Sequence, residues 1–162
     1  MFRRSGERLE LLLAHPGGPF FAQKDAGAWT IPKGEAAPEE DLLTRARIEF
    51  EEEVGIAAVS DRWIELGSIK QKGGKTVHAW AFEGDLPEGF VVTSNEFEIE
   101  WPPRSGRRAK FPEVDQACFF DDLTAREKLK ATQLPLIDRL REHLAATTTT
   151  RRDGAQTRDN RC

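Results

Sequence analysis

The chain has 162 residues, of which 38% are hydrophobic and 32% are charged, and it carries a formal net charge of −4. This length and composition indicate one soluble domain with a single core. The weakly acidic balance excludes a strong overall attraction to nucleic acid or anionic membranes, so an anionic substrate must be drawn by local basic residues or by a metal ion.

No apolar stretch reaches the length of a membrane span, and the start MFRRSGERLE lacks the apolar core of a signal peptide. The two cysteines, Cys118 and Cys162, form neither a disulfide framework nor a metal-ligand pattern, and the histidines show no ligand spacing. We therefore expect a cytoplasmic protein with no membrane partner and no stable nucleic-acid partner.

Hydrophobic patterning predicts several strands around two helices. Leu9–Ala14 is an apolar strand, and residues 28–35 (AWTIPKGE) form a second, short extended piece. Further strands are predicted at 62–69, 76–84, 90–101 and 117–120, with a polar loop at 101–115, a closing helix at 124–144 interrupted by Pro135, and a disordered tail at 145–162. This order is not a simple βαβ alternation and predicts an α+β fold for a single domain at 1–144, with helices packed on a mixed sheet.

The acidic segment between Gly34 and Ile56 contains the first helix. Pro38 and the three acidic residues after it suit a first helical turn, and Gly55 is a stop signal. The apolar residues recur every four positions, at Leu42, Ala46, Phe50 and Val54. This spacing predicts an amphipathic helix.

Three glutamates share one face of that helix. With Glu49 as the origin, a rotation of about 100° per residue places Glu53 at about +40° and Glu52 at about −60°, beside the apolar stripe, whereas Glu51 points away. Such like charges repel unless a cation compensates them, and Mg²⁺ prefers oxygen ligands. Composition alone favours a solvated acidic helix, so both interpretations stay open on these residues.

The segment resembles the Nudix box, G-x5-E-x7-R-E-U-x-E-E-x-G-U, where U is a bulky apolar residue. Eight of the nine defined positions match: Gly34, Glu40, Glu49, Phe50, Glu52, Glu53, Gly55 and Ile56. The resemblance covers roughly residues 9–144 and implies an α/β/α sandwich with a mixed sheet between helices. The loops HPGGPF, WTIPKGE, QKGGK and FPEVD resemble a bacterial Nudix group described as predicted NTP pyrophosphohydrolases.

The resemblance also implies an activity and a set of site residues. It implies hydrolysis of a nucleoside diphosphate linked to another moiety, with Mg²⁺ or Mn²⁺ as the cofactor. Glu49, Glu52 and Glu53 are then the metal-binding carboxylates, joined by the backbone carbonyl of Gly34. Lys33 is expected to contact phosphate, and family members are often dimers.

Two features depart from the family pattern. Ile48 stands where the family has an arginine that orients the catalytic glutamate. Arg45 lies four residues before Glu49 on the same face and is the predicted replacement. Much of the strand that family members place ahead of Leu9–Ala14 is missing, so either the gene start is misassigned or the sheet loses an edge.

Candidates outside the helix lie in two loops. Glu113 precedes the predicted last strand and is the expected base or additional metal ligand, with Asp115 as the alternative. Arg104 and Arg107 are expected to bind substrate phosphates, because arginine forks match phosphate oxygens. Glu96, Glu98 and Glu100 alternate with apolar residues and are interpreted as the solvent face of a strand.

We therefore expect a Nudix pyrophosphohydrolase that acts on nucleoside triphosphates or related nucleoside diphosphate derivatives, with catalytic roles for Glu49, Glu52 and Glu113. A dinucleoside polyphosphate hydrolase is the second hypothesis. Ile48 and the short first strand leave open a catalytically weak nucleotide-binding module, and the bland alternative is a metal-free acidic interaction helix.

Overall fold

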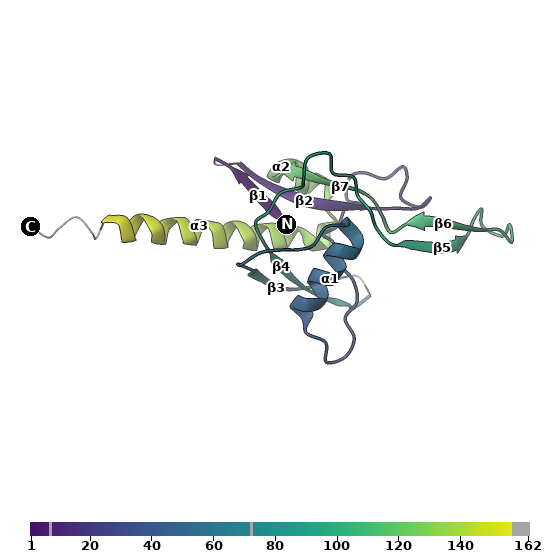
Figure 1. Cartoon of the computed structure of the whole chain (residues 1–162), viewed down its shortest axis with the longest axis horizontal. Helices are drawn as coiled ribbons and strands as arrows, with labels where there is room; N and C mark the ends of the chain where they lie inside the picture. The colour runs from purple at the N-terminus through teal and green to yellow at the C-terminus, as the bar shows by residue number, and fades with distance from the viewer. Residues whose placement is uncertain (7, 72, 157–162) are drawn as a thin grey trace, which may run out of the picture.

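The computed structural model describes residues 1–6, 8–71 and 73–156. Its elements follow one another as β1 (Phe2–Ser5), β2 (Arg8–Pro16), α1 (Leu42–Val54), β3 (Ile64–Lys70), β4 (Thr76–Ala81), β5 (Glu96–Glu100), β6 (Arg108–Pro112), β7 (Val114–Asp121), α2 (Asp122–Lys128), the 3₁₀ turn η1 (Ala131–Gln133) and α3 (Leu134–Gln156) (Figure 1). None of the helices within these residues is long and apolar enough to cross a membrane.

The strands form three antiparallel sheets, in the orders β1-β2-β7, β3-β4 and β5-β6. The first two are joined in parallel, because the N–H of Phe2 donates to the carbonyl of Phe82 (2.9 Å) and the N–H of Gly84 donates to the carbonyl of Phe2 (2.9 Å). This junction gives the central layer its mixed character.

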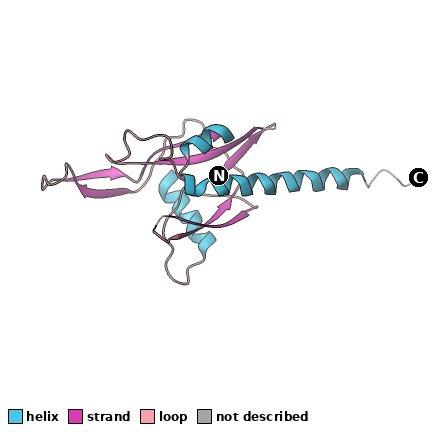
Figure 2. Cartoon of the chain, turned by 180° about the vertical axis from the view of Figure 1, so that it is seen from behind, coloured by secondary structure: helices cyan, strands magenta, loops and turns pink. Residues whose placement is uncertain are grey.

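The central layer has a core on each face. Leu11 and Leu13 of β2 face a cluster that includes Leu136 and Leu140 of α3. Leu12 points the opposite way, into a cluster with Phe50 of α1. Neighbouring residues of a strand alternate between faces, so a continuous apolar run fits a strand covered on both sides. Helices therefore lie on both faces of the strands, as the α+β prediction requires (Figure 2).

Several boundaries differ from the sequence predictions, and four of the differences change which segments are helix or strand. The 101–115 segment contains β6, which pairs with β5 from Glu96↔Pro112 to Glu100↔Arg108. The closing helix is two helices, and Pro135 lies in the first turn of α3, where its missing N–H costs no helical hydrogen bond. A four-residue β1 stands where much of a strand was expected to be missing.

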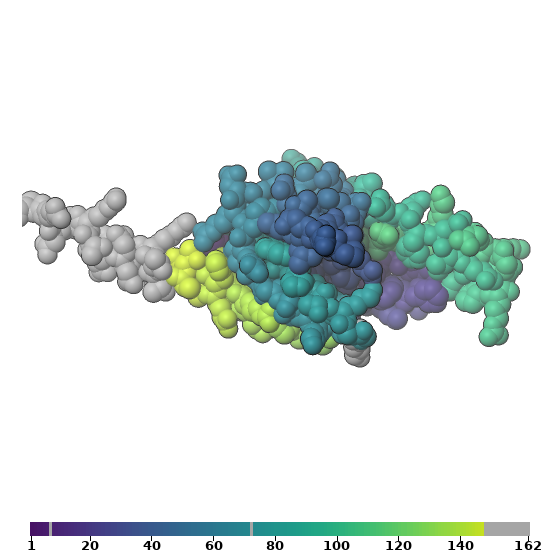
Figure 3. Space-filling view, turned by 90° about the horizontal axis from the view of Figure 1, so that it is seen from below, coloured from purple at the N-terminus to yellow at the C-terminus, as the bar shows by residue number. Residues whose placement is uncertain are grey.

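The fourth difference concerns the predicted disordered tail, residues 145–162. The chain is helical as far as Gln156 because α3 continues beyond its packed first turns, and residues 157–162 lie outside the described residues. Once a helix is nucleated, each further residue adds a backbone hydrogen bond. The helix leaves the domain at one end, opposite the β5–β6 hairpin, with α1 on the surface between them (Figure 3).

Candidate functional site

Helix α1 is capped at both ends. The side chain of Asp41 accepts a hydrogen bond from the N–H of Thr44 (2.8 Å), and Gly55 ends the helix with φ 89°. Both are typical helix-capping arrangements. The helix therefore begins at Leu42 and not at Pro38, because Glu40 Oε2 accepts from the N–H of Ala37 (2.9 Å) and forms a separate turn ahead of the cap.

The three carboxylates lie on the face that the helical spacing predicts. Glu49 and Glu53 are buried, with 9% and 8% of their surface exposed, and Glu52 is half-buried. Glu51 is exposed. Ionised side chains are rarely this buried without partners, so each of these carboxylates needs a compensating contact.

The loop that precedes α1 supplies some of those contacts. The N–H of Lys33 donates to Glu53 Oε2 (2.9 Å). The backbone of Gly34 lies directly against the Glu49 carboxylate, since a Cβ at position 34 would stand 1.6 Å from the Glu49 carboxyl carbon. A larger residue at position 34 would force the Glu49 carboxylate to move, so glycine lets the backbone and this carboxylate stay in contact.

Arg45 makes the contact predicted for it. Its Nε donates to Glu49 Oε1 (2.7 Å), and its Nη2 contacts the same oxygen and donates to Glu52 Oε2 (3.0 Å). These bonds raise the pKa of the Arg45 guanidinium. Ile48 is exposed and makes no substitute contact with the carboxylates, so Arg45 holds two of the three carboxylates from the preceding turn.

The Glu53 carboxyl has a pKa raised to about 7. Burial is the main cause, and the charges of Glu49 and Glu113 raise the pKa further, whereas the hydrogen bond and the charge of Lys33 lower it. The exposed Glu113 is therefore close enough to repel Glu53. Asp115 instead turns to His15, so Glu113 is the carboxylate that this loop presents to α1.

A short connection fixes Glu113 relative to α1. The N–H of Asn95 donates to the carbonyl of Glu52 (3.2 Å), and the N–H of Glu113 donates to the carbonyl of Asn95 (2.8 Å). Ser94 Oγ bonds both the N–H and the carbonyl of Val114 (3.0 Å each). This link could not be predicted from the sequence, because Ser and Asn in an extended segment have no distinctive spacing.

Lysines gather near the loop that carries Lys33, but not all of the predicted basic residues lie there. Lys33 lies close enough to Lys130 for its charge, together with burial, to lower the pKa of the Lys130 ammonium. The ammonium groups of Lys24 and Lys130 lie 4.9 and 5.8 Å from the centroid of the same Phe21 ring. No carboxylate lies within ion-pair distance of these three lysines among the residues that the structure describes.

Arg104 and Arg107 lie elsewhere. They belong to the turn between β5 and β6, and this hairpin projects away from the domain (Figure 1). The pairing of Glu100 with Arg108 places the whole turn beyond the last paired residues. The structure therefore does not bring these two arginines to the carboxylates, whereas Lys130, which sequence reasoning missed, lies near Lys33.

The oxygen atoms at this site are of the chemical type that binds a hard divalent cation. Carboxylate oxygens and the Gly34 carbonyl are ligands that Mg²⁺ and Mn²⁺ accept. As the side chains stand, no three His, Cys, Asp or Glu groups of residues 1–6, 8–71 and 73–156 converge into a metal-binding cluster. Arg45 engages both Glu49 and Glu52 in this arrangement, so metal binding requires at least one of these carboxylates to turn from the guanidinium.

An apolar cavity of about 190 Å³ adjoins the carboxylates. It lies between α1 and the central strands, and Phe50, Ala79 and Phe82 are among its lining residues. Lys33 and Glu49 border it as well. The site thus combines carboxylates, free lysines and an apolar recess, which suits a ligand with a charged and an apolar part.

These features define the class of the fold: the chain has the fold of a Nudix hydrolase, as its sequence predicted. A solved structure, that of a C. elegans Ap4A hydrolase in a binary complex, aligns over 90% of this chain and 94% of its own, with a TM-score of 0.62 and 19% sequence identity. At this identity the likeness concerns the fold. No family model matches the sequence, and no curated protein matches it.

Proposed function

We propose that the chain hydrolyses a diphosphate linkage in a nucleoside triphosphate or a related nucleoside diphosphate derivative. The observation that carries this proposal is the meeting of three segments at the buried α1 carboxylates: the backbone of Gly34 lies against Glu49, and Glu113 lies near Glu53. A binding surface for a protein would not need a carboxylate whose ionisation is opposed by burial and by two like charges.

The proposed cation ligands are Glu49, Glu52, Glu53 and the carbonyl of Gly34. A divalent cation bound there would neutralise phosphate charge and make a bound water more acidic. Arg45 orients Glu49 and Glu52 until they engage the cation. Glu113 is the proposed base that takes the proton of the attacking water, because it is exposed and stands within electrostatic reach of Glu53.

Lys33 and Lys130 are proposed to bind the phosphates that are not attacked. Both are half-buried and neither has a carboxylate partner among the described residues, so an anion would relieve the repulsion between them. Nucleoside triphosphates are the first candidate substrates. Dinucleoside polyphosphates are the second, and the fold likeness to an Ap4A hydrolase favours including them.

The test is release of phosphate or pyrophosphate from nucleoside triphosphates and dinucleoside polyphosphates with Mg²⁺ or Mn²⁺. We expect Glu52→Gln and Glu53→Gln each to lower kcat/KM on the order of 100-fold. Glu51→Gln is the matched control on the same helix, because Glu51 is exposed, and it should retain activity. If the folded wild type is inert with both metals but binds nucleotide, the chain is a binding module and the proposal is wrong.

A further inference from the structure

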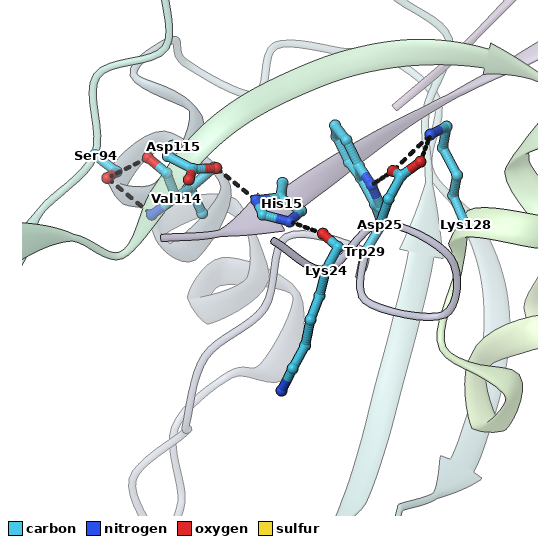
Figure 4. Close-up of polar contacts among 8 residues, drawn as sticks. All are labelled: His15, Lys24, Asp25, Trp29, Ser94, Val114, Asp115 and Lys128. Carbon is cyan, nitrogen blue, oxygen red and sulfur yellow. Dashed lines mark hydrogen bonds and ion pairs between the residues drawn. The ribbon is translucent and has the colours of Figure 1, made fainter. Parts of the chain in front are cut away.

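A buried histidine stands at the end of β2, outside the carboxylate cluster. Only 4% of His15 is exposed. Its Nδ1 lies 2.6 Å from Asp115 Oδ1, and its Nε2 lies 2.7 Å from the backbone carbonyl oxygen of Lys24 (Figure 4). Both ring nitrogens therefore have a polar partner, and the two contacts fix the orientation of the imidazole.

The His15 side chain joins three segments: the end of β2, the loop at Lys24 and the start of β7. The β2–β7 register shifts between His15 and Pro16, so the strands are no longer held by a regular ladder at this point. The His15–Asp115 pair crosses that irregularity. The side-chain contact between His15 and Asp115 therefore aligns β2 with β7 where the regular backbone hydrogen bonds are interrupted.

The same region holds the backbone of Glu113. The N–H of Gly17 donates to the Glu113 carbonyl (2.9 Å). A Cβ at position 17 would stand 2.1 Å from the carbonyl oxygen of Pro112, so the two chains are in direct contact. Glu113 is thus fixed on one side by Gly17 and, two residues later, by Asp115, and on the other side by Asn95, which is bonded to α1.

We propose that His15 is a positioning residue for the reaction: through Asp115 it holds the start of β7 so that Glu113 faces the α1 carboxylates. This inference rests on the proposed function and assigns His15 a role in it. A buried polar pair adds little net stability compared with apolar residues of similar volume, so fixing a geometry is a better account of this pair than strengthening the fold.

A double-mutant cycle tests the proposal. Asp115→Ala and His15→Phe are each made in the wild type and in Glu113→Gln, and kcat and KM are measured with the best substrate and saturating Mg²⁺. In the wild type we expect kcat to fall about 10-fold with little change in KM. In Glu113→Gln we expect no further loss, because the positioned group is already gone.

Asp25→Asn is the matched control. Asp25 lies next to Lys24 and anchors the same loop, since its carboxylate accepts from Trp29 Nε1 (2.8 Å) and Lys128 Nζ (2.6 Å), but it does not reach β7 (Figure 4). This variant should leave kcat unchanged in both backgrounds. If His15→Phe does not fold, Asp115→Ala carries the test, because the Asp115 side chain is 32% exposed and its removal leaves no closed cavity.

Three results would overturn the inference: an unchanged kcat in folded Asp115→Ala, an equal loss in both backgrounds, or an equal loss in Asp25→Asn. Failure of the proposed function gives a different pattern, namely a wild type that hydrolyses nothing. A wild type that depends on Glu52 and Glu53 but not on Glu113 leaves the proposed function intact and rejects the role of His15.

Discussion

Among the α1 carboxylates, Glu53 has the surroundings that a purely structural role explains least well. It is 8% exposed, it accepts a hydrogen bond from the N–H of Lys33, and it lies near the like charges of Glu49 and Glu113. The hydrogen bond favours the ionised carboxylate, but burial and the two charges outweigh it, and the pKa rises to about 7. A cation beside Glu53 would reverse that balance.

This raised pKa predicts how stability depends on pH without divalent cations. The folded-state pKa of about 7 lies above the ordinary 4.5, so the folded chain binds this proton more tightly than the unfolded chain. The contribution is complete below pH 4.5 and is lost as the pH rises through 7. From pH 4.5 to 8 the free energy of unfolding should fall by on the order of 3 kcal/mol more in the wild type than in Glu53→Gln.

Urea unfolding at several pH values, with a chelator present, measures this difference. Glu51→Gln is the control and should follow the wild type, because Glu51 is exposed. Parallel stability curves for the wild type and Glu53→Gln would show that Glu53 is not held in the folded chain as described.

Residue-level predictions from the sequence succeeded where spacing alone decides contact. Arg45 and Glu49 are four residues apart on a helix, and that separation predicted their hydrogen bond. Burial of Glu53 and its closeness to Glu113 depend on how two distant segments pack, so helical spacing could not predict the raised pKa. The catalytic and metal-binding roles of these residues stay predictions.

At the scale of elements, the segments between the helices and strands position the residues of the candidate site. The segment before α1 places Lys33 against Glu53, and the link through Asn95 joins α1 to the start of β7. The chain after α2 runs beside the segment before α1, because the N–H of Lys130 donates to the carbonyl of Trp29 (2.9 Å). Two lysines from distant parts of the sequence thereby stand side by side.

These two lysines give the second prediction. Lys33→Gln and Lys130→Gln should each raise KM for a nucleotide substrate about 5-fold, with a smaller effect on kcat, because each would lose a charge that we propose contacts phosphate in both the ground state and the transition state. Steady-state kinetics measures both constants. Lys110→Gln on the β5–β6 hairpin is the control, and an equal KM increase there would point to a general effect of charge.

Helices and strands with one clear hydrophobic period in the sequence were predicted well. Segments whose residues suit more than one kind of structure were not. The β3–β4 hairpin and α1 appear where alternation and four-residue recurrence place them. Strand β6 was missed because Arg108 and Lys110 made its alternation look like a polar loop. The start of α1 was misplaced because Pro38 and the acids after it suit a helix as well as the turn they form.

At the scale of the whole molecule, the central strands bring the loop before α1, the segment at Asn95 and the loop before β7 to the acidic side of α1. Two-sided burial of β2 requires a helix on each face, and the apolar stripe of α1 covers one of them. The acidic face beside that stripe is then directed at the loops before α1 and before β7. The sandwich could be predicted from the acidic segment and its resemblance, whereas the apolar cavity and the paired lysines could not, because only the folded chain assembles them.

Direct titration of Mn²⁺ into the protein at pH 8 tests the central claim most closely, because Glu53 is then ionised. Calorimetry on the wild type, Glu53→Gln and Glu51→Gln separates the site from a general acidic surface. We predict that Glu53→Gln binds Mn²⁺ at least about 10-fold more weakly than the wild type and that Glu51→Gln binds it equally well. A wild type that binds Mn²⁺ no more tightly than Glu53→Gln would contradict a metal site on α1 and, with it, the proposed hydrolase.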